Sequence, residues 1–506
     1  AQMARADAFA VEHGVPSLTL MENAGRAVAD AIGARFKPCP VTVLCGPGNN
    51  GGDGFVVARL LKKKRIPCEV ALLARREELS PDATHNFNSF VKLKGKVSEI
   101  GADDLGVLGE RARKSGLVVD AILGTGVKSE VRGLYADAIT SINACGVPVI
   151  AVDIPSGVHT DAGAPLGVAV KAAMTVALGF AKRGEVIYPG INYVGNLIVA
   201  DIGIAAEAVA AVNPDTELLE PETVHRLVPR RAPDTHKGSY GHVLVIAGSR
   251  GKTGAAILAC RAAMRSGAGL TTLAAPRSLN NIFASSLIEV MTEPLGDNAA
   301  EEIEPLSDED WRRLLERKDV VLFGPGIGVS PATQNNLRWL LRNLAIPWVI
   351  DADGLNNLAL EIDRLKQAKT APVLTPHPGE MARLTGKSTA EVNADRVKIA
   401  QSFASEHHCH VILKGARTVV ATASGKVFIN PTGNPGMASG GMGDALAGIL
   451  AALLGQGLAP EDAMKLGVYL HGFVGDRLAA SKGGIGLIAS DIIEGLPEGL
   501  RAIASA

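Results

Sequence analysis

A glycine-rich stretch at residues 434–444 carries the residue types that phosphate chemistry needs. Four of its eleven residues are glycine, and the apolar run at 445–454 that follows predicts a buried helix. Free backbone N–H groups and the positive end of the helix dipole favour a bound phosphate at such a loop. Asp444 repels phosphate, but it suits the role of base for a hydroxyl that meets a phosphoryl group. The alternative is that Asp444 only caps the helix.

A second glycine-rich stretch, residues 46–54, lies between a predicted strand and a predicted helix. It begins with G-x-G-x-x-G, which in this context is typical of dinucleotide-binding folds. It departs from that pattern because Asn49, Asn50 and Asp53 add polar side chains where the backbone alone would suffice. The next predicted strand, 68–74, ends in two arginines rather than an acid for a ribose. These departures count against an ordinary NAD site.

Two further predicted strands of the first half end in loops that contain acids. One loop covers residues 120–130, and the other begins at Asp153. Ligands bind at the carboxyl ends of the strands in an open parallel sheet, so we expect Asp120, Asp153 and Ser156 to converge with Asn50. Each acid taken singly could be a structural cap instead. The coincidence of three such loops favours a site.

The second half contains another glycine-rich stretch after a strand, residues 248–254. It is not a P-loop, because G-x-x-x-x-G-K-T requires glycine at the position of Ile246. A later strand-end loop, 375–380, carries His377 and Glu380. Two prolines flank His377, which indicates a rigid loop, and a histidine with purely local bonds is the alternative. A single histidine without neighbouring ligands does not make a zinc site.

A predicted hairpin at 411–430 delivers the chain to the 434–444 stretch. It carries Lys414 and Arg417, two cations that can meet phosphates. Ordinary solvated turn charges are the alternative interpretation of such a pair.

The elements that must position these residues alternate between strands and helices in both halves. The first half predicts helices over 3–36 and 55–65, and strands at 41–45, 68–74, 117–122, 148–152, 174–179 and 196–202. The second half predicts strands at 242–247, 270–275, 320–323, 348–350, 373–374, 411–414, 419–423 and 427–430. This rhythm predicts two doubly wound α/β modules. The proline-rich segment at 207–233 is the expected join, with domains at 1–213 and 234–506 and a linker at 214–233.

Composition limits the possible classes of partner. The net charge is −1 and aromatic residues make up 4%, which argues against nucleic acid and anionic membranes. No segment is apolar enough to span a membrane. The six cysteines are scattered and lie mostly in apolar runs, which favours buried free thiols and a reducing cytoplasm.

Several of these motifs together resemble one family. Residues 434–444, which end in Gly-Gly-Met-Gly-Asp, resemble the anion hole and catalytic aspartate of the ribokinase-like superfamily. Residues 375–380 and 414–418 narrow the resemblance to the domain that dehydrates damaged nicotinamide cofactors. Residues 46–54 and 152–157 are similar to the companion epimerase domain. In this order the chain resembles the bifunctional NAD(P)H-hydrate repair enzymes over nearly its whole length, with a Rossmann-like and then a ribokinase-like domain.

The resemblance implies two activities on NADH or NADPH hydrated at C6 of the nicotinamide ring. An N-terminal NAD(P)H-hydrate epimerase would interconvert the R and S forms. A C-terminal ADP-dependent dehydratase would convert the S form to NAD(P)H and release AMP and phosphate, with Mg²⁺ assisting. Asp444 would be its catalytic base. The hydrate would contact Ala255, Gly326, Gly328, His377 and Asp444, and ADP would contact Lys414, Gly415, Ala416, Arg417, Thr418, Gly440, Gly441 and Gly443.

For the epimerase half the resemblance implies a cofactor-binding site and a potassium ion. The hydrate would contact Asn49, Asn50, Gly51, Gly52, Asp53, Gly124, Thr125, Gly126, Val127, Lys128, Ser129, Glu130 and Asp153. Potassium would bind Asn50, Asp120 and Ser156, whose hard oxygen ligands suit a hard cation. Asp153 is the expected acid–base group, and Asp120 is the alternative.

Two other functions remain as alternatives. A vitamin or small-molecule kinase domain fused to a nucleotide-binding regulatory domain would also use Asp444, although His377, Glu380 and the fused first half argue against it. A regulatory protein that only binds nucleotide would not need an intact base. The resemblance also implies a homo-oligomer.

Overall fold

The computed structural model describes residues 2–505, and the chain divides into two compact units. Unit 1 is Ala1–Pro214 and unit 2 is Asp215–Ala506. The boundary differs from the expected linker at 214–233, because Asp215 onward belongs to unit 2. There β8 (Thr216–Leu218) pairs with a strand of the sheet, and α10 (Pro221–His225) packs against the last helix. The polar, proline-rich composition of this segment concealed these two short elements.

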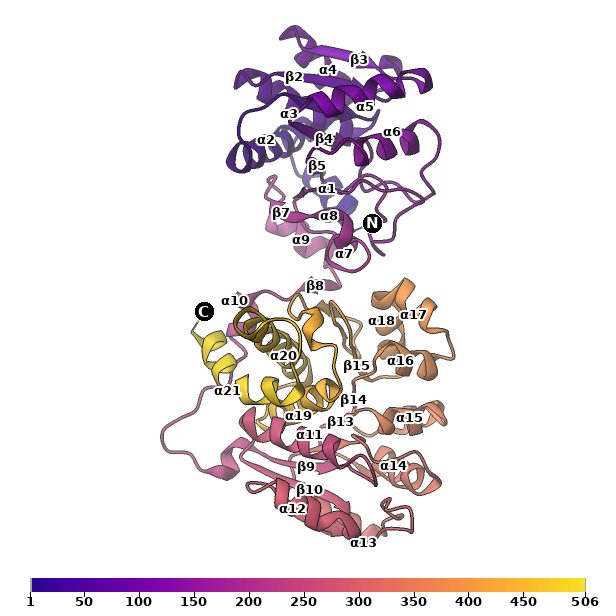
Figure 1. The fold of residues 1–506 in the computed structure, drawn as a ribbon, viewed down its shortest axis with the longest axis vertical. Coiled ribbons are helices and arrows are strands. Elements are labelled where there is room, and N and C mark those ends of the chain that lie inside the picture. The colour runs from indigo at the N-terminus through magenta and orange to yellow at the C-terminus, as the bar shows by residue number, and fades with distance from the viewer. Residues whose placement is uncertain (1, 506) are drawn as a thin grey trace. The chain divides into compact units, whose positions relative to one another are not determined.

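Unit 1 is built on a seven-stranded sheet, all of whose neighbouring strands are parallel (Figure 1). In spatial order its strands are β3 (Lys96–Glu99), β2 (Cys68–Leu72), β1 (Val41–Cys45), β4 (Leu117–Ala121), β5 (Val149–Val152), β6 (Met174–Leu178) and β7 (Asn196–Ala200). The central strands β1, β4 and β5 are wholly buried because helices cover both faces, and they are apolar except for Thr42 and Asp120. Asp120, expected in the loop 120–130, thus lies in β4. The sequence predicts six of the strands and misses β3, whose short, partly exposed pattern is polar.

Helices form a layer on each face of this sheet. One core contains α2 (Ser17–Arg35), α3 (Asn49–Lys63) and α4 (Pro81–Lys92), and the other contains α5 (Leu105–Lys114) and α6 (Leu134–Asn143). The remaining helices of unit 1 are α1 (Gln2–Glu12), α7 (Arg183–Val186), α8 (Ile191–Val194) and α9 (Ala206–Val212).

Helix α3 begins at Asn49, six residues before the expected start at Phe55. Its glycines argued for a loop, but they let the helix approach its neighbours closely. A Cβ on Gly51 would lie 1.9 Å from the Gly46 carbonyl oxygen, and one on Gly52 would lie 2.7 Å from Met21. Packing therefore outweighs low helix propensity here.

Unit 2 is built on a ten-stranded sheet with one antiparallel hairpin. In spatial order its strands are β11 (Met291–Leu295), β10 (Leu270–Pro276), β9 (His242–Ile246), β12 (Val320–Phe323), β13 (Trp348–Ile350), β14 (Val373–Leu374), β15 (His410–Leu413), β16 (Val419–Ala421), β17 (Val427–Ile429) and β8. The pairs β15–β16 and β16–β17 are antiparallel, which confirms the predicted hairpin, and the others are parallel. With unit 1, this arrangement confirms the predicted doubly wound α/β class. Strands β8 and β11 were not predicted.

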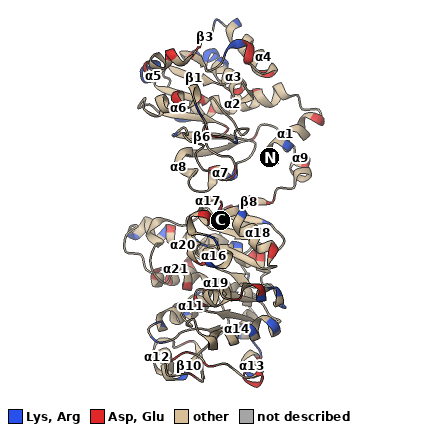
Figure 2. Ribbon diagram, turned by 90° about the vertical axis from the view of Figure 1, so that its right-hand side faces the viewer, with Lys and Arg blue, Asp and Glu red and all other residues tan. Residues whose placement is uncertain are grey.

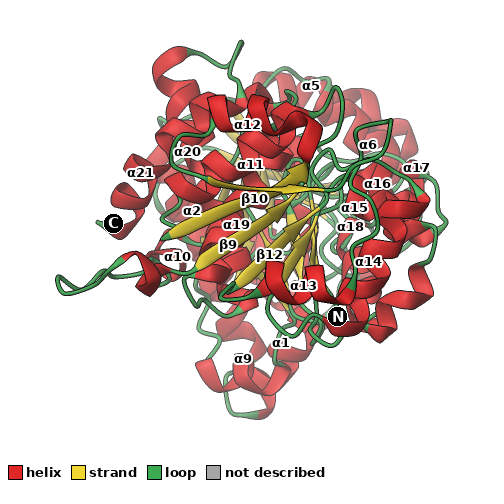
Figure 3. Ribbon diagram, turned by 90° about the horizontal axis from the view of Figure 1, so that it is seen from below, coloured by secondary structure: helices red, strands yellow, loops and turns green. Residues whose placement is uncertain are grey.

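Two layers of helices cover this sheet, as Figure 3 shows for β10, β9 and β12. One layer contains α11 (Thr253–Arg265), α12 (Asn280–Ser286), α19 (Met442–Gly455), α20 (Pro460–Lys482) and α21 (Ala489–Ala504), which share one core. The other helices are α13 (Asp308–Leu315), α14 (Pro331–Asn343), α15 (Asp353–Ala359), α16 (Pro378–Thr385), α17 (Thr389–Ala394) and α18 (Arg396–Glu406).

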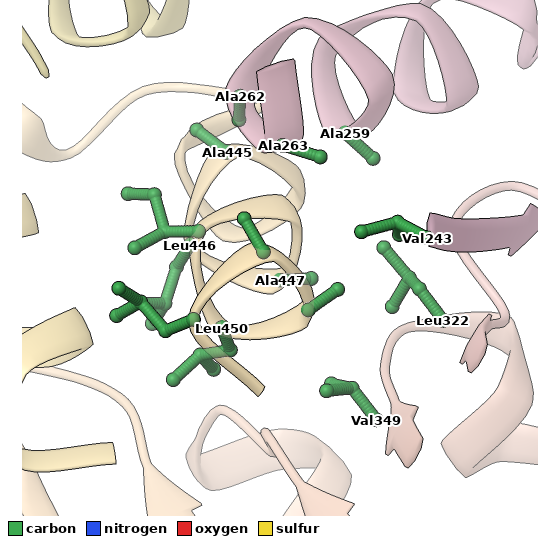
Figure 4. Close-up of a cluster of buried hydrophobic side chains, with 14 of the residues drawn as sticks. Val243, Ala259, Ala262, Ala263, Leu322, Val349, Ala445, Leu446, Ala447 and Leu450 are labelled. Carbon is green, nitrogen blue, oxygen red and sulfur yellow. The ribbon is translucent and has the colours of Figure 1, made fainter. Parts of the chain in front are cut away.

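Helix α19 lies at the centre of the first layer (Figure 4). Its residues Ala445 to Leu454 are all buried, against α11, α20 and the strands β9, β12 and β13. Gly448 permits close contact with α11, because a Cβ there would lie 2.2 Å from the Ala259 carbonyl oxygen. A helix that is buried on all sides holds its first turn rigidly, and Asp444 lies in that turn.

Candidate active sites

Unit 1 contains a cavity of ≈ 620 Å³ at the carboxyl ends of β1, β4 and β5. Loops after these strands supply much of its lining, and α1 and α2 supply apolar side chains. Of the predicted hydrate-binding residues, the cavity is lined by Asn49, Asn50, Asp53, Gly124, Thr125, Gly126, Val127 and Asp153. Gly51 and Gly52 are instead buried inside α3, while Lys128, Ser129 and Glu130 are exposed beyond the lining. The structure therefore brings the strand-end loops together as expected, but not every residue along them.

Asp153 occupies a backbone conformation that non-glycine residues rarely adopt, with φ of 69°. Its carboxylate accepts a hydrogen bond from Leu178 N at 3.2 Å and forms an ion pair with Lys182. The side chain of Lys182 is only 3% exposed, and its Nζ also donates to the Leu178 carbonyl. Strained backbone held at a cavity wall is typical of a functional position. Sequence reasoning did not identify Lys182 as a site residue. The only feature that could have indicated it is its position shortly after the end of β6.

Asp120 and Ser156 form a buried pair behind the cavity rather than on its wall. The Asp120 carboxylate accepts hydrogen bonds from Ser156 Oγ at 2.6 Å, Ser156 N at 2.8 Å and Ile122 N at 3.2 Å. Burial raises the pKa of Asp120 to about 6, although these hydrogen bonds oppose the rise. Three donors engage its carboxylate, which leaves about one acceptor site, and its side chain does not line the cavity. Asp120 is therefore poorly placed for proton transfer to a ligand.

Asn50 lies beside the loop that joins this pair to the cavity. A Cβ on Gly124 would be 3.3 Å from the Asn50 Cβ, and Ser156 Oγ accepts a hydrogen bond from Leu123 N. Both polar atoms of the Asn50 amide are buried and have no partner among the described residues. Buried polar groups are almost always satisfied, so an unpaired amide in a site indicates a missing ligand or ion.

Asp444 of unit 2 is the third residue of α19, whose N-cap is Gly441 in the left-handed conformation. Asp444 therefore does not cap the helix, and the structural alternative for this residue is wrong. Burial raises the pKa of Asp444 to about 7, and the Asp351 carboxylate adds to the rise while Lys414 opposes it. A carboxylate that titrates near neutral pH is well suited to general base catalysis.

Lys414 lies directly beside this helix start. A Cβ on Gly443 would be 3.2 Å from Lys414 Nζ, so glycine leaves room for the ammonium group. Nζ donates to Asp351 Oδ1 at 2.8 Å and lies 3.8 Å from Glu380 Oε2. Burial lowers the pKa of Lys414, but the Asp351 and Glu380 carboxylates outweigh burial, and the pKa is raised overall. An ammonium group and free helix N–H groups at one point form an anion site.

Sequence reasoning did not identify Asp351 as the partner of Lys414. Asp351 is almost fully buried and also accepts from Thr375 Oγ1 at 2.7 Å. Glu380, expected in a loop, lies instead in the first turn of α16 and is buried. The prolines around His377 concealed a helix start, which proline favours at its first position.

His377 is the N-cap of α16. Its Nδ1 accepts from Gly379 N at 3.0 Å and Glu380 N at 3.3 Å, which places the proton on Nε2 in the neutral ring. Burial and the nearby charge of Lys414 lower the pKa of His377 below its usual range. The side chain remains half-exposed, with Nε2 3.6 Å from Glu380 Oε1. His377 thus makes local hydrogen bonds, as the alternative interpretation predicted. It also has a half-exposed Nε2 donor that lies close to the Glu380 carboxylate.

Ala255, in the first turn of α11, lies close to the loop after β12 that contains Gly326 and Gly328. A Cβ on Gly326 would lie 3.3 Å from the Ala255 Cβ, and Gly328 N donates to Asp353 Oδ2 at 3.1 Å. Asp353 in turn interacts electrostatically with Asp444. The predicted hydrate-binding residues of unit 2 therefore converge on the start of α19.

The loop from Lys414 to Thr418 is held by Arg396 of α18, which sequence reasoning missed. The Arg396 guanidinium donates to the backbone carbonyls of Leu413 at 2.9 Å, Lys414 at 3.1 Å and Ala416 at 2.6 Å. Nothing surrounds Gly440 within 4 Å of an added Cβ, so the loop is open there. Gly415, Arg417, Thr418 and Gly441 complete these two loops, and the Gly441 backbone packs against Leu258.

The described residues form neither a metal-binding cluster of acids, histidines and cysteines nor a membrane-spanning helix. Within residues 2–505 there is no group of three or more His, Cys, Asp and Glu side chains arranged to hold a metal ion. No helix in that range combines the length and the apolarity needed to cross a bilayer. Figure 2 shows basic and acidic residues interspersed on the helices in view, without an extended basic face there.

The fold and these sites define a two-unit α/β protein whose second unit is a nucleotide-dependent domain of ribokinase-like class. Residues 17–184 match the family described as YjeF-related protein N-terminus, and residues 243–498 match the family described as NAD(P)H-hydrate dehydratase. The chain belongs to the family of bifunctional NAD(P)H-hydrate repair enzymes. It is 43% identical to the member from Moorella thermoacetica over 99% of this chain and 96% of that protein. It is 37% identical to the Escherichia coli member over 96% of this chain and 89% of that protein.

A solved structure resembles part of the chain. It is the ADP/ATP-dependent NAD(P)H-hydrate dehydratase from Bacillus subtilis co-crystallised with ATP and Mg²⁺. That protein is 29% identical, with a TM-score of 0.50, and the match covers 56% of this chain and 98% of the other. These similarities do not favour a vitamin kinase fused to a regulatory domain.

Proposed function

We propose that the chain repairs hydrated nicotinamide cofactors in two reactions. Unit 1 interconverts the R and S hydrates of NADH and NADPH. Unit 2 dehydrates the S hydrate at the expense of ADP and releases AMP and phosphate. Membership of the bifunctional family supports both reactions, and the chemistry of the two sites supports the residue roles given below.

The dehydration needs a better leaving group than hydroxide. In unit 2, Asp444 removes the proton of the C6 hydroxyl as its oxygen attacks the β-phosphoryl group of ADP and AMP departs. The ring nitrogen then expels phosphate from C6, and loss of a proton from the adjacent ring carbon restores the dihydronicotinamide. Backbone N–H groups of residues 440–443 and the Lys414 ammonium stabilise the charge on the transferring group.

The observation that supports this step most directly is the juxtaposition of Asp444 and Lys414 at the start of α19. Asp444 has a pKa near neutrality, and the ammonium group is beside Gly443. Lys414 to Thr418 and Gly440 to Gly443 hold the nucleotide, while Ala255, Gly326, Gly328 and His377 hold the hydrate. Because no described acidic cluster forms a metal cage, Mg²⁺ would arrive with the nucleotide phosphates, as is usual for this ion.

In unit 1, Asp153 is the acid–base group and Asp120 is not. Asp153 lines the cavity, whereas Asp120 lies behind it with its carboxylate engaged by three donors. Potassium would bind Asn50, Asp120 and Ser156. The residues fit such an ion, because the unpaired Asn50 amide oxygen, a carboxylate and a hydroxyl supply hard oxygen donors. The ion would hold the cavity loops in place around the substrate.

Two further properties are proposed. We expect a reducing cytoplasmic location, which the six free cysteines support. Assembly into a homo-oligomer stays a prediction, and light scattering on the purified chain checks it.

The experiment is a repair assay on the purified chain. Hydrated NADH of both epimers is incubated with ADP, with ATP, or without nucleotide, and regenerated NADH is followed by its absorbance. Complete recovery in two phases, dependent on nucleotide, is expected. Absence of recovery with both nucleotides would rule out the dehydratase.

A further inference from the structure

Four carboxyl groups line the cavity of unit 1, and three of them interact electrostatically with one another. Asp7 comes from α1, Asp53 from the second turn of α3, and Asp153 from the loop after β5. One acid–base group needs only Asp153, so the presence of the other two requires an explanation. Asp82 of α4 is a fourth acid on the cavity wall, and Lys182 is the cation that reaches this group from behind Asp153.

The structure treats Asp53 and Asp153 differently. Asp153 accepts hydrogen bonds from Lys182 and from Leu178 N, so its carboxylate has two donors within the protein. No group among the described residues donates a hydrogen bond to the Asp53 carboxyl, although Asp53 is only 9% exposed. A carboxyl that is largely buried and has no donor favours its protonated form, because burial disfavours the charge.

The electrostatics of the cavity point the same way. Burial raises the pKa of Asp53 well above its usual range, and the charges of Asp153 and Asp7 add to the rise while Lys182 opposes it. Burial also raises the pKa of Asp7 to about 6, with Asp153 adding to the rise. Behind Lys182 lies Glu185, whose pKa burial raises to about 8. Lys182 forms its ion pair with Asp153, and its charge opposes the pKa rise of Asp7, Asp53 and Glu185 without cancelling it.

We propose that Asp53 is a second catalytic residue of unit 1, a proton donor that works with Asp153 as proton acceptor. This inference rests on the proposed epimerase reaction and adds to it. Two acids held in different protonation states are a recurring arrangement for acid–base pairs. Lys182 is a positioning residue, because its ion pair fixes the place of the Asp153 carboxylate on the cavity wall.

The proton and electron count of the step is balanced. Asp53 gives its proton to the C6 hydroxyl, the C6–O bond breaks, and water leaves as the ring nitrogen lone pair forms the C6=N bond. A water molecule then adds to C6 from the opposite face, and Asp153 takes its proton as the C6=N electrons return to nitrogen. The epimer is inverted, Asp53 is ionised and Asp153 is protonated. Conversion in the opposite direction, or proton exchange with solvent, restores the starting state.

Inversion by loss and re-addition of water can be distinguished from inversion by ring opening, in which no water is lost. The hydroxyl oxygen of the product comes from solvent, so each inversion incorporates one oxygen atom from labelled water. The rate also depends on the protonated form of Asp53, so it falls as pH rises through the pKa of Asp53.

The test follows the conversion of the purified R hydrate of NADH to the S hydrate by the full chain in ¹⁸O-labelled water, without nucleotide. The wild-type chain is expected to label the product at the rate of inversion, above the rate without protein. Asp53→Asn is expected to lower both rates by ~10²–10⁴, the usual contribution of a positioned acid. Dehydration of the S hydrate in unit 2, measured in a separate assay with ADP, serves as the control and stays at the wild-type rate.

A second variant covers the possibility that Asp53→Asn perturbs folding of unit 1. Asp7→Asn keeps Asp53 and Asp153 but removes a charge that raises the Asp53 pKa. Its alkaline loss of rate is therefore expected at lower pH than in the wild-type chain. Inversion at the wild-type rate in Asp53→Asn, an unlabelled product, or an unmoved alkaline limb in Asp7→Asn would overturn the inference and leave the epimerase intact. A wild-type chain that does not invert the hydrate would refute the proposed epimerase and this inference together.

Discussion

The two sites use a buried lysine in opposite ways. In unit 1, Lys182 pairs with the proposed catalytic carboxylate itself, Asp153. In unit 2, Lys414 pairs with a different acid, Asp351, at 2.8 Å, and Asp444 is left with a pKa of about 7. Both lysines are well buried, yet only Lys182 forms its ion pair with the proposed base of its own site.

The difference follows from what each site must bind. The anion site of unit 2 needs a cation that is not paired with the catalytic base, Asp444. Asp351 instead holds the Lys414 ammonium group where a phosphoryl group would lie. Asp444 then needs no cation of its own, because its role is to accept the proton that leaves the C6 hydroxyl of the hydrate. In unit 1 no phosphoryl group reacts, and the cation can serve the carboxylate directly. The predictions below test this contrast.

The largest effect is expected from Asp444→Asn. The amide keeps the shape of the side chain but cannot accept the proton, so dehydration of the S hydrate falls by ~10²–10⁴. Inversion of the R hydrate in unit 1 is unaffected. Rates are measured from NADH absorbance with ADP present. Glu309→Gln, an exposed acid on α13, is the control and keeps the wild-type rate. Full activity in Asp444→Asn would contradict the assignment of the base.

Lys414→Met is expected to damage stability and activity together. It leaves Asp351 buried without its cation, which typically costs about 3–5 kcal/mol of unfolding free energy. The double variant Asp351→Asn with Lys414→Met removes the unpaired charge and recovers most of that stability, measured by denaturant unfolding. Dehydratase activity does not return, because the ammonium group at the anion site is still missing. Recovery of activity in the double variant would show that Lys414 has only a structural role.

Dehydration is expected to depend steeply on pH. The raised pKa of Asp444 means that the base is protonated below about pH 7, so kcat falls about tenfold for each unit below that value. The rate levels off above it, because the carboxylate is then fully ionised. A pH–rate profile of S-hydrate dehydration checks this, and a rate that is constant from pH 5 to pH 8 on that profile would contradict it.

The smallest effect is expected at the potassium site. Asn50→Ala breaks no hydrogen bond within the chain, so the melting temperature should change little. Inversion of the R hydrate should lose its stimulation by K⁺ over a bulky organic cation, by a factor of several. Dehydration in unit 2 is the matched control for ionic strength. Equal stimulation in the variant and the wild-type chain would exclude Asn50 as a ligand.

Sequence reasoning predicted most strands and strand-end loops, because buried parallel strands are apolar and the residue types change sharply to polar ones where the strands end. Asp153 and Asp444 could be found in this way. It was less successful where packing overrode local propensity, as in the glycine-rich start of α3 at Asn49. It could not find Lys182 or Arg396, whose roles depend on contacts with residues far along the chain or on buried backbone carbonyls. The residues adjacent to Lys182 and Arg396 in the sequence do not indicate such contacts.

The most direct test that the two reactions depend on two different carboxylates uses the variant Asp153→Asn with both hydrate epimers and ADP. Recovery of NADH is followed while the epimers are resolved chromatographically. We expect the S hydrate to be repaired at the wild-type rate and the R hydrate to disappear only at the rate seen without protein. Rapid repair of both epimers, or loss of repair for both, would contradict two reactions carried by two separate carboxylates.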